Sequence, residues 1–330
     1  MKGGLNGPPW KPLKGFKSVK LLPMLLLSLH LTACSETLPV ESTEEEAETE
    51  AEEAETEAEE AEPFPQFRLN CQHITRENAP FDIRFHYQFD KGYFSDNPKR
   101  QNTLETAALI WQRIIAEDMP AVDQGSFNMT DDETGIRHTV PLEDPIDDIL
   151  VVVYAFPLES SSTKAYGGNS YMRSNPENSD GDNAADISPK IGYLVFNTEG
   201  SRPWFFDQTP ETSDDIPRDT HYDFLSTALH ELGHALGFLS GDYEAAGVLG
   251  DGFFTGVHAT AWNDGEPIPM DGSHIDWSMQ KGLKAADHQY HAMHGTVPEQ
   301  GVRWLPTMLD ALMLKDLGYD IDETCVPDIL

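Results

Sequence analysis

The pattern His-Glu-Leu-Gly-His at residues 230–234 constrains this chain more than any other stretch. Side chains four residues apart lie on the same face of an α-helix, so His230 and His234 can direct two imidazole nitrogens at one point. Glu231 is rotated by about a third of a turn and can stand beside that point without binding there. Such a pair is typical of a catalytic zinc, with Glu231 placed to take a proton from the water that the metal activates.

The residues around this pattern predict a mostly buried helix. The expected N-cap is Asp219 or Thr220, and Gly237 is placed to end the helix in a left-handed turn. Two histidines and a glutamate would be costly to bury here without a partner, which favours a metal site over a chance match. The apolar faces are supplied by Leu225, Ala228, Leu229, Leu232, Ala235 and Leu236.

The spacing of the pattern leaves the third metal ligand open. A catalytic zinc has three protein ligands, and Ser240 stands where the longer pattern H-E-x-x-H-x-x-G-x-x-H has its last histidine. A serine is a poor zinc ligand, so another side chain must complete the site. The candidates are Asp242, His258, His274 and the histidines between residues 288 and 294.

The chain resembles the leishmanolysin-like metzincins, strongly only between about residues 219 and 319. In that family an insertion precedes the third histidine, which lies in a Ser-His-Trp-like motif. Residues 272–277, Gly-Ser-His-Ile-Asp-Trp, are similar but hold two extra residues before the tryptophan. The resemblance implies that His274 is the third ligand. It also implies that Met293, between two histidines, is the floor residue of a methionine-containing turn beneath the metal.

The same resemblance implies an α+β, metzincin-like domain over residues 63–330. Its N-terminal subdomain, 63–237, is expected to be a twisted mixed sheet with two long helices. Its C-terminal subdomain, 238–330, is expected to be rich in loops and to end with one closing helix. The function implied is that of a zinc endopeptidase with Glu231 as general base and acid. The alternative is a non-proteolytic binding or adhesion lipoprotein that retains the fold.

Hydrophobic periodicity predicts the elements that precede the helix with His230 and His234. Residues 81–89 alternate apolar and polar side chains, as a half-buried strand does, and residues 102–117 have a helical period. The apolar run 149–156 predicts a strand covered on both faces. A further strand is expected at 192–197, and the resemblance implies that it is the edge to which substrate adds. Residues 241–272, rich in Gly, Asp and Pro, are expected to form loops.

The composition is strongly acidic, with a formal net charge of −35. Residues 35–62 hold 14 glutamates and no Lys or Arg, and residues 63–330 still carry 43 acidic against 17 basic side chains. Such a chain repels phosphate backbones, so nucleic acid is not an expected partner. Calcium is compatible with this charge. Residues 178–183 have oxygen ligands at calcium-like spacing but lack a later bidentate glutamate, so they are either a calcium site or a plain Asx-rich turn.

The N-terminal segment predicts export. Residues 1–33 have a basic start and a short apolar run, as a signal peptide does. The sequence before Cys34 resembles a bacterial lipobox, which implies lipidation of Cys34, a membrane anchor and an outer-membrane lipoprotein facing either side; an ordinary secretory signal is the alternative. Residues 34–62 then form a disordered, self-repelling acidic tether.

Cys71 and Cys325 remain once Cys34 is assigned to the anchor. Two leftover cysteines in an exported protein commonly pair, so we expect a disulfide that ties together the two ends of the folded body.

Overall fold

The chain divides into two units, Met1–Glu59 and Glu60–Leu330. The computed structural model describes most of the second unit, and the signal peptide, Cys34 and the acidic tether lie outside the described residues. No helix among the described residues is long and apolar enough to cross a lipid bilayer. The described residues are 66–131, 133–160, 162–172, 189–200, 203–207, 209–211, 216–217, 220–276, 293 and 303–329.

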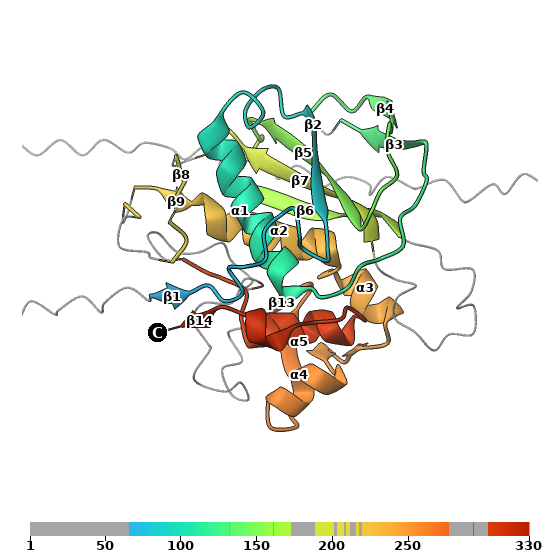
Figure 1. Cartoon of the computed structure of the whole chain (residues 1–330), viewed down its shortest axis with the longest axis vertical. Coiled ribbons are helices and arrows are strands. Elements are labelled where there is room, and N and C mark those ends of the chain that lie inside the picture. The colour runs from blue at the N-terminus through green and yellow to red at the C-terminus, as the bar shows by residue number, and fades with distance from the viewer. Residues whose placement is uncertain are drawn as a thin grey trace, which may run out of the picture. The chain divides into compact units, whose positions relative to one another are not determined.

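A four-stranded mixed sheet, in the order β2-β5-β7-β6, forms the centre of this unit (Figure 1). The parallel strands are β2 (Ile83–Phe89), β5 (Ile149–Phe156) and β7 (Pro189–Asn197). The fourth strand, β6 (Ala165–Met172), runs antiparallel to β7. Together with the helices described below, this sheet makes the unit α+β, the class that the sequence led us to expect.

Strand β5 is buried along its whole length, which confirms the prediction of a strand covered on both faces. On one face Val151 and Val153 pack in a core that includes the helices. On the other face Val152 packs with the hairpin of β3 (Ser126–Thr130) and β4 (Arg137–Pro141). A continuous apolar run is therefore needed because successive side chains enter two separate cores.

The edge of the sheet is β6, so the expectation that residues 192–197 form the edge strand is wrong. Strand β7 lies between β5 and β6 and pairs with both. The two glycines of β6 disfavour a strand by propensity, but Gly167 is required by a close approach to the backbone of α2. A β-carbon at Gly167 would overlap the carbonyl oxygen of Glu231, and one at Gly168 would lie 2.9 Å from the Tyr193 hydroxyl.

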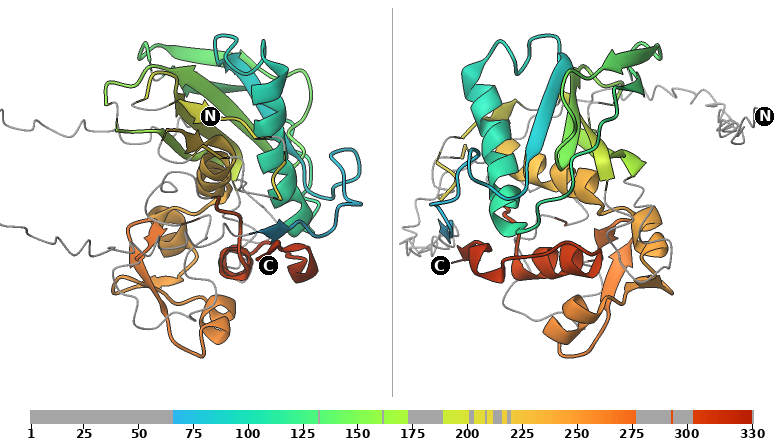
Figure 2. Two further views of the ribbon diagram at one scale, coloured as in Figure 1. Left: turned by 90° about the vertical axis from the view of Figure 1, so that its left-hand side faces the viewer. Right: turned by 45° about the vertical axis from the view of Figure 1, so that its right-hand side comes forward.

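Two helices cover one face of the sheet (Figures 1 and 2). The first, α1 (Pro98–Ile114), confirms the predicted helix but begins four residues earlier than expected. Asn97 caps it by accepting a hydrogen bond from the backbone N–H of Arg100, and Pro98 occupies the first helical position. Trp111 then joins α1 to the helix that carries His230 and His234, through a 3.0 Å hydrogen bond from its indole N–H to the carbonyl of Leu229.

The helix that carries His230 and His234, α2 (Phe224–Leu236), is buried at every position. Its N-cap is Asp223, so the expected cap at Asp219 or Thr220 is wrong. Tyr222–Asp223 form the short strand β9, and this extended pairing prevents the helix from starting earlier. The helix ends at Gly237, which has a φ of +123° that favours glycine.

The part of the chain after α2 holds more regular structure than the loops predicted for residues 241–272. Its core is a small antiparallel sheet in the order β10-β11-β12-β13, flanked by two short helices. The composition predicted loops because Gly, Asp and Pro occupy the many turns between these very short elements. The elements are α3 (Ser240–Ala245), β10 (Leu249–Gly250), β11 (Phe253–Phe254), α4 (Val257–Trp262), β12 (Ile268–Asp271) and β13 (His274–Ile275).

The last helix among the described residues is α5 (Met308–Asp316). It begins with a capping box formed by Thr307 and Asp310. Cys325 forms a disulfide with Cys71, with their Cα atoms 5.1 Å apart, so the two ends of the described body are covalently joined. The remaining elements are the 3-10 turn Glu323–Cys325, β8 (Trp204–Phe205), and β1 (Phe67–Arg68) paired with β14 (Asp328–Ile329).

Candidate metal centre

Three imidazoles meet at one point between α2 and β13. His230 and His234 come from successive turns of α2, and His274 is the first residue of β13. The Nε2 atom of His234 lies 3.2 Å from that of His230 and 3.1 Å from that of His274, and the Nε2 atoms of His230 and His274 are 3.2 Å apart. The three nitrogens therefore form a nearly equilateral triangle, and these residues can hold a metal ion.

This triangle fits a metal ion better than a set of hydrogen bonds. A neutral imidazole nitrogen carries either one proton or one lone pair, so three Nε2 atoms cannot all bond to one another. His234 Nδ1 lies 2.6 Å from the carbonyl oxygen of Phe238, which can only accept, so Nδ1 carries the proton and Nε2 offers its lone pair. Tetrahedral ligands at about 2.0–2.1 Å from a zinc ion are about 3.3–3.4 Å apart, close to the separations seen here.

The surroundings of His234 and His274 favour the neutral form of both imidazoles. Burial, with a smaller contribution from His274, lowers the pKa of His234 to about 4 in the metal-free fold. Burial also lowers the pKa of His274, although the nearby Asp271 partly opposes this. Neutral imidazole is the form that binds metal, so these ligands are ready to bind at neutral pH.

Glu231 is buried beside the histidines and lines the same cleft. Burial raises the pKa of its carboxyl to about 8, and a hydrogen bond with the backbone of Gly167 opposes the shift only in part. The pKa of this carboxyl lies near neutral pH because the fold removes the group from water. Among the described residues, no cationic side chain compensates for this burial. Such a shift is typical of a group that exchanges protons.

The cleft in front of the histidines has a volume of about 380 Å³. One wall is the start of the edge strand β6 with the residues before it, and the floor is formed by α2. Leu239 and Ser273 close the side next to β13. Gly167 allows this arrangement, because any side chain at that position would push β6 away from the backbone of Glu231.

Met293 packs directly beneath α2. Its side chain is fully buried, and a β-carbon at Gly233 would overlap its sulfur atom. Two hydrogen bonds fix the backbone of Met293: its N–H donates to the Asp310 carboxylate, and its carbonyl accepts from the N–H of Ile275. Gly233 lies between His230 and His234 of α2, so the thioether supports the helix at the site.

Gly233→Ala is therefore expected to destabilise the metal-free protein by about 1–3 kcal/mol, as overpacking of a core does. In an open helix the same change would stabilise by about 0.5–1 kcal/mol. Here the new methyl would meet both Met293 and the Phe238 ring. Urea unfolding measures the effect. Gly241→Ala, in α3 with no atom within 4 Å of its β-carbon, is the matched control and should be neutral or stabilising. A gain at both positions would contradict the packing argument.

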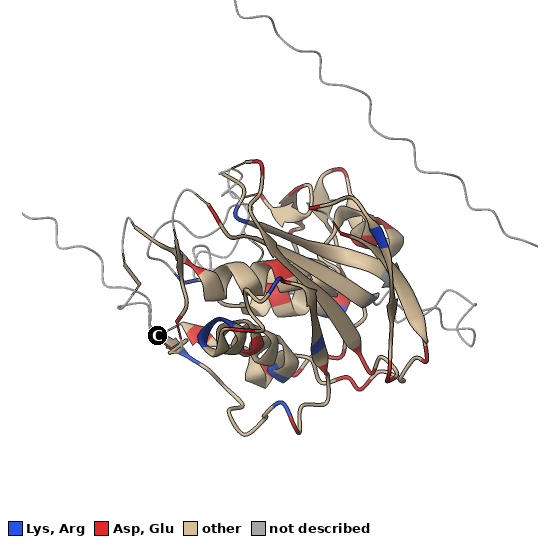
Figure 3. Cartoon of the chain, turned by 90° about the horizontal axis from the view of Figure 1, so that it is seen from above, with Lys and Arg blue, Asp and Glu red and all other residues tan. Residues whose placement is uncertain are grey.

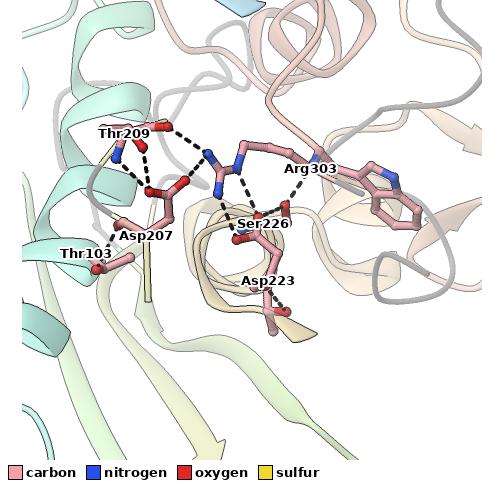
Figure 4. Close-up of polar contacts among 8 residues, drawn as sticks. Thr103, Asp207, Thr209, Asp223, Ser226 and Arg303 are labelled. Carbon is pink, nitrogen blue, oxygen red and sulfur yellow. Dashed lines mark hydrogen bonds and ion pairs between the residues drawn. The ribbon is translucent and has the colours of Figure 1, made fainter. Parts of the chain in front are cut away.

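The start of α2 is held by a buried cluster of charges (Figure 4). Arg303 is completely buried and binds both carboxylate oxygens of Asp223, at 3.1 and 2.9 Å, while it is also ion-paired with Asp207. Burial alone would lower the pKa of Arg303, but the two aspartates outweigh it and raise the pKa. Asp223 caps the helix through the backbone N–H of Ser226, so Arg303 fixes the cap itself.

Among the described residues, neither Asp242 nor His258 joins the group of three histidines. Asp242 accepts a hydrogen bond from Asn169, and His258 is exposed on α4. The 288–294 histidines, Trp277 and the calcium candidate at 178–183 lie outside the described residues. Sequence reasoning missed Gly167, Phe238 and Arg303. Only the two consecutive glycines of β6 could have signalled the first of them.

Comparison with known proteins adds no further assignment. No protein-family model matches the chain, and the search of curated proteins gives no match.

Proposed function

We propose that this protein is a zinc-dependent endopeptidase similar to the leishmanolysin-like metzincins. The observation that carries the proposal is the triangle of Nε2 atoms, 3.1–3.2 Å apart, with the buried carboxyl of Glu231 in the same cleft. A purely structural metal site has no use for that carboxyl. A site with three imidazole ligands and access from a cleft is typical of catalytic zinc.

His230, His234 and His274 would hold the ion. When bound, zinc supplies a Lewis acid and lowers the pKa of a water ligand from 15.7 toward about 7. Glu231 accepts the proton of the attacking water and delivers it to the leaving amine. A buried carboxyl in the same cleft as the three imidazoles is placed to accept a proton and then to deliver it, as general acid–base catalysis requires.

The edge strand β6 offers a place for the substrate backbone. It pairs with β7 along one side, and no strand pairs with its other side among the described residues. An extended peptide can add to such an edge through main-chain hydrogen bonds. Gly167 brings this edge against Glu231, so an added peptide would pass the carboxyl and the histidines. The proposed substrates are therefore proteins or peptides bound in an extended conformation.

Charge and the N-terminal segment supply the rest of the proposal. Acidic positions lie on loops and helix ends in the view of Figure 3, and residues 63–330 hold 43 acidic against 17 basic side chains. This distribution supports a protein substrate and not a nucleic acid. Residues 1–62 support export and a lipid anchor at Cys34, and hence an outer-membrane location.

The test is to measure zinc content and cleavage of casein by the full-length protein. We expect one zinc per chain, loss of cleavage with 1,10-phenanthroline and recovery when zinc is restored. His274→Ala should lose both zinc and cleavage, because the two remaining imidazoles are fewer than the three protein ligands of a catalytic zinc. His258→Ala is the matched control, since His258 is exposed and away from the site, and it should retain both. Zinc binding without cleavage of any protein substrate would favour the binding or adhesion alternative.

A further inference from the structure

His274 is held differently from the other two histidines. His230 and His234 are fixed by the buried helix α2. His274 instead starts a strand of two residues, which pairs with β12 through the register Asp271↔His274. Its position therefore depends on what holds the turn before it, at Gly272 and Ser273.

Ser273 is hydrogen-bonded on both its side chain and its backbone by the short helix α3. The backbone N–H of Ser240 donates to Ser273 Oγ at 3.0 Å, and the two serine hydroxyls are 3.2 Å apart. The hydroxyl of Tyr243 donates to the carbonyl oxygen of Ser273 at 3.0 Å. That carbonyl belongs to the peptide bond that links Ser273 to His274, so Tyr243 acts on the backbone of the ligand itself.

The helix that makes these contacts is also joined to the other parts of the site. It follows α2 after three residues, one of which is Phe238, whose carbonyl orients His234. Asp242 of α3 accepts a hydrogen bond of 2.7 Å from Asn169 of the edge strand β6. Tyr243 is fully buried, so α3 is anchored in the core from below. One short segment thus contacts α2, the cleft wall and the turn that carries His274.

We propose that Ser240 and Tyr243 are positioning residues for the metal. Through Ser273 they place the His274 imidazole at the distance from His230 and His234 that a metal requires. The inference rests on the metal site of the proposed function but not on the peptidase activity. Partners that orient a ligand without touching the metal typically change its affinity about 10–100-fold when they are removed.

The experiment measures the zinc dissociation constant of the full-length protein by competition with a chromophoric chelator. Tyr243→Phe removes one hydroxyl and leaves the ring, and it should weaken zinc binding by about 10–100-fold. Ser273→Ala removes the side-chain acceptor and should act in the same direction. In the Co²⁺-substituted proteins, both variants should show a shifted visible absorption spectrum, because the geometry of the third nitrogen changes.

Tyr154→Phe is the matched control. Its buried hydroxyl also donates to a backbone carbonyl at 3.0 Å, that of Thr130, but on the sheet face away from α2. Both tyrosine variants should lose similar stability in the metal-free state, and only Tyr243→Phe should lose zinc affinity and change the Co²⁺ spectrum. Equal zinc affinities in the wild type, Tyr243→Phe and Ser273→Ala would overturn this inference alone. A wild type that binds no zinc would overturn the proposed function as well.

Discussion

Glu231→Gln is expected to lower kcat for a protein substrate by about 10²–10⁴-fold while the zinc content remains that of the wild type. Glutamine has nearly the same size and fills the same buried position, but it cannot accept the proton of the attacking water. The three imidazoles that hold the ion are unchanged. Cleavage of casein under single-turnover conditions, with zinc measured on the same samples, gives both quantities. A variant that keeps zinc and cleaves as fast as the wild type would reject the role of Glu231.

The same substitution has a stability signature that serves as its control. Burial raises the pKa of Glu231 to about 8 in the metal-free fold, whereas a carboxyl in the unfolded chain titrates at about 4.3. Between these values the folded state binds more protons than the unfolded state, so stability falls as the pH rises from about 4.3 to 8. Glutamine does not titrate, so the variant should escape this loss.

The metal-free Glu231→Gln protein should therefore exceed the metal-free wild type in free energy of unfolding by a few kcal/mol at pH 8, and by less toward pH 5. His234, whose lowered pKa has the opposite pH dependence, is present in both proteins and cancels from the difference. Urea unfolding at several pH values measures this. A stability difference that grows as the pH falls would contradict the assignment of the raised pKa to Glu231.

Arg303→Met is expected to destabilise the protein by about 3–5 kcal/mol. Methionine fills part of the space, but it leaves the carboxylates of Asp207 and Asp223 buried without their cationic partner. Asp223 also caps α2, so the effect reaches the element that carries His230 and His234. Urea unfolding of the metal-free protein measures the loss, and zinc affinity should fall with it because the start of α2 is no longer held.

Arg68→Met is the matched control for the buried arginine. Arg68 also pairs with an aspartate, Asp328, but the side chains of this pair are 63% and 44% exposed. Water and salt screen such a pair, so its removal should cost only about 0–1 kcal/mol. Similar losses for the two variants would show that burial does not distinguish the two ion pairs, against our account of the helix cap.

The elements that sequence predicted well are those whose signal is local. The apolar run of β5 and the helical period of α1 depend on neighbouring residues, and both are present with small shifts at the ends. The misplaced features depend on distant contacts. The N-cap of α2 is Asp223 and not Asp219 or Thr220, because the residues before the helix pair with β8. The edge strand β6 was missed because its glycines are weak strand formers, and Gly167 is there for a close approach to the backbone of Glu231.

The sequence alone determined that two imidazoles and a carboxyl share one helix, because the spacing of His230, Glu231 and His234 needs only the helical repeat to become geometry. Several residues remained open as the third ligand, and no pattern pointed to Arg303 or to the carbonyl of Phe238. The tertiary structure brings His274 beside His230 and His234, and it places Arg303 and the carbonyl of Phe238 against α2. A side chain forty positions away reaches α2 only when the intervening strands, the turn at Ser273 and the buried Met293 are packed together, and this depends on contacts that no short stretch of sequence specifies.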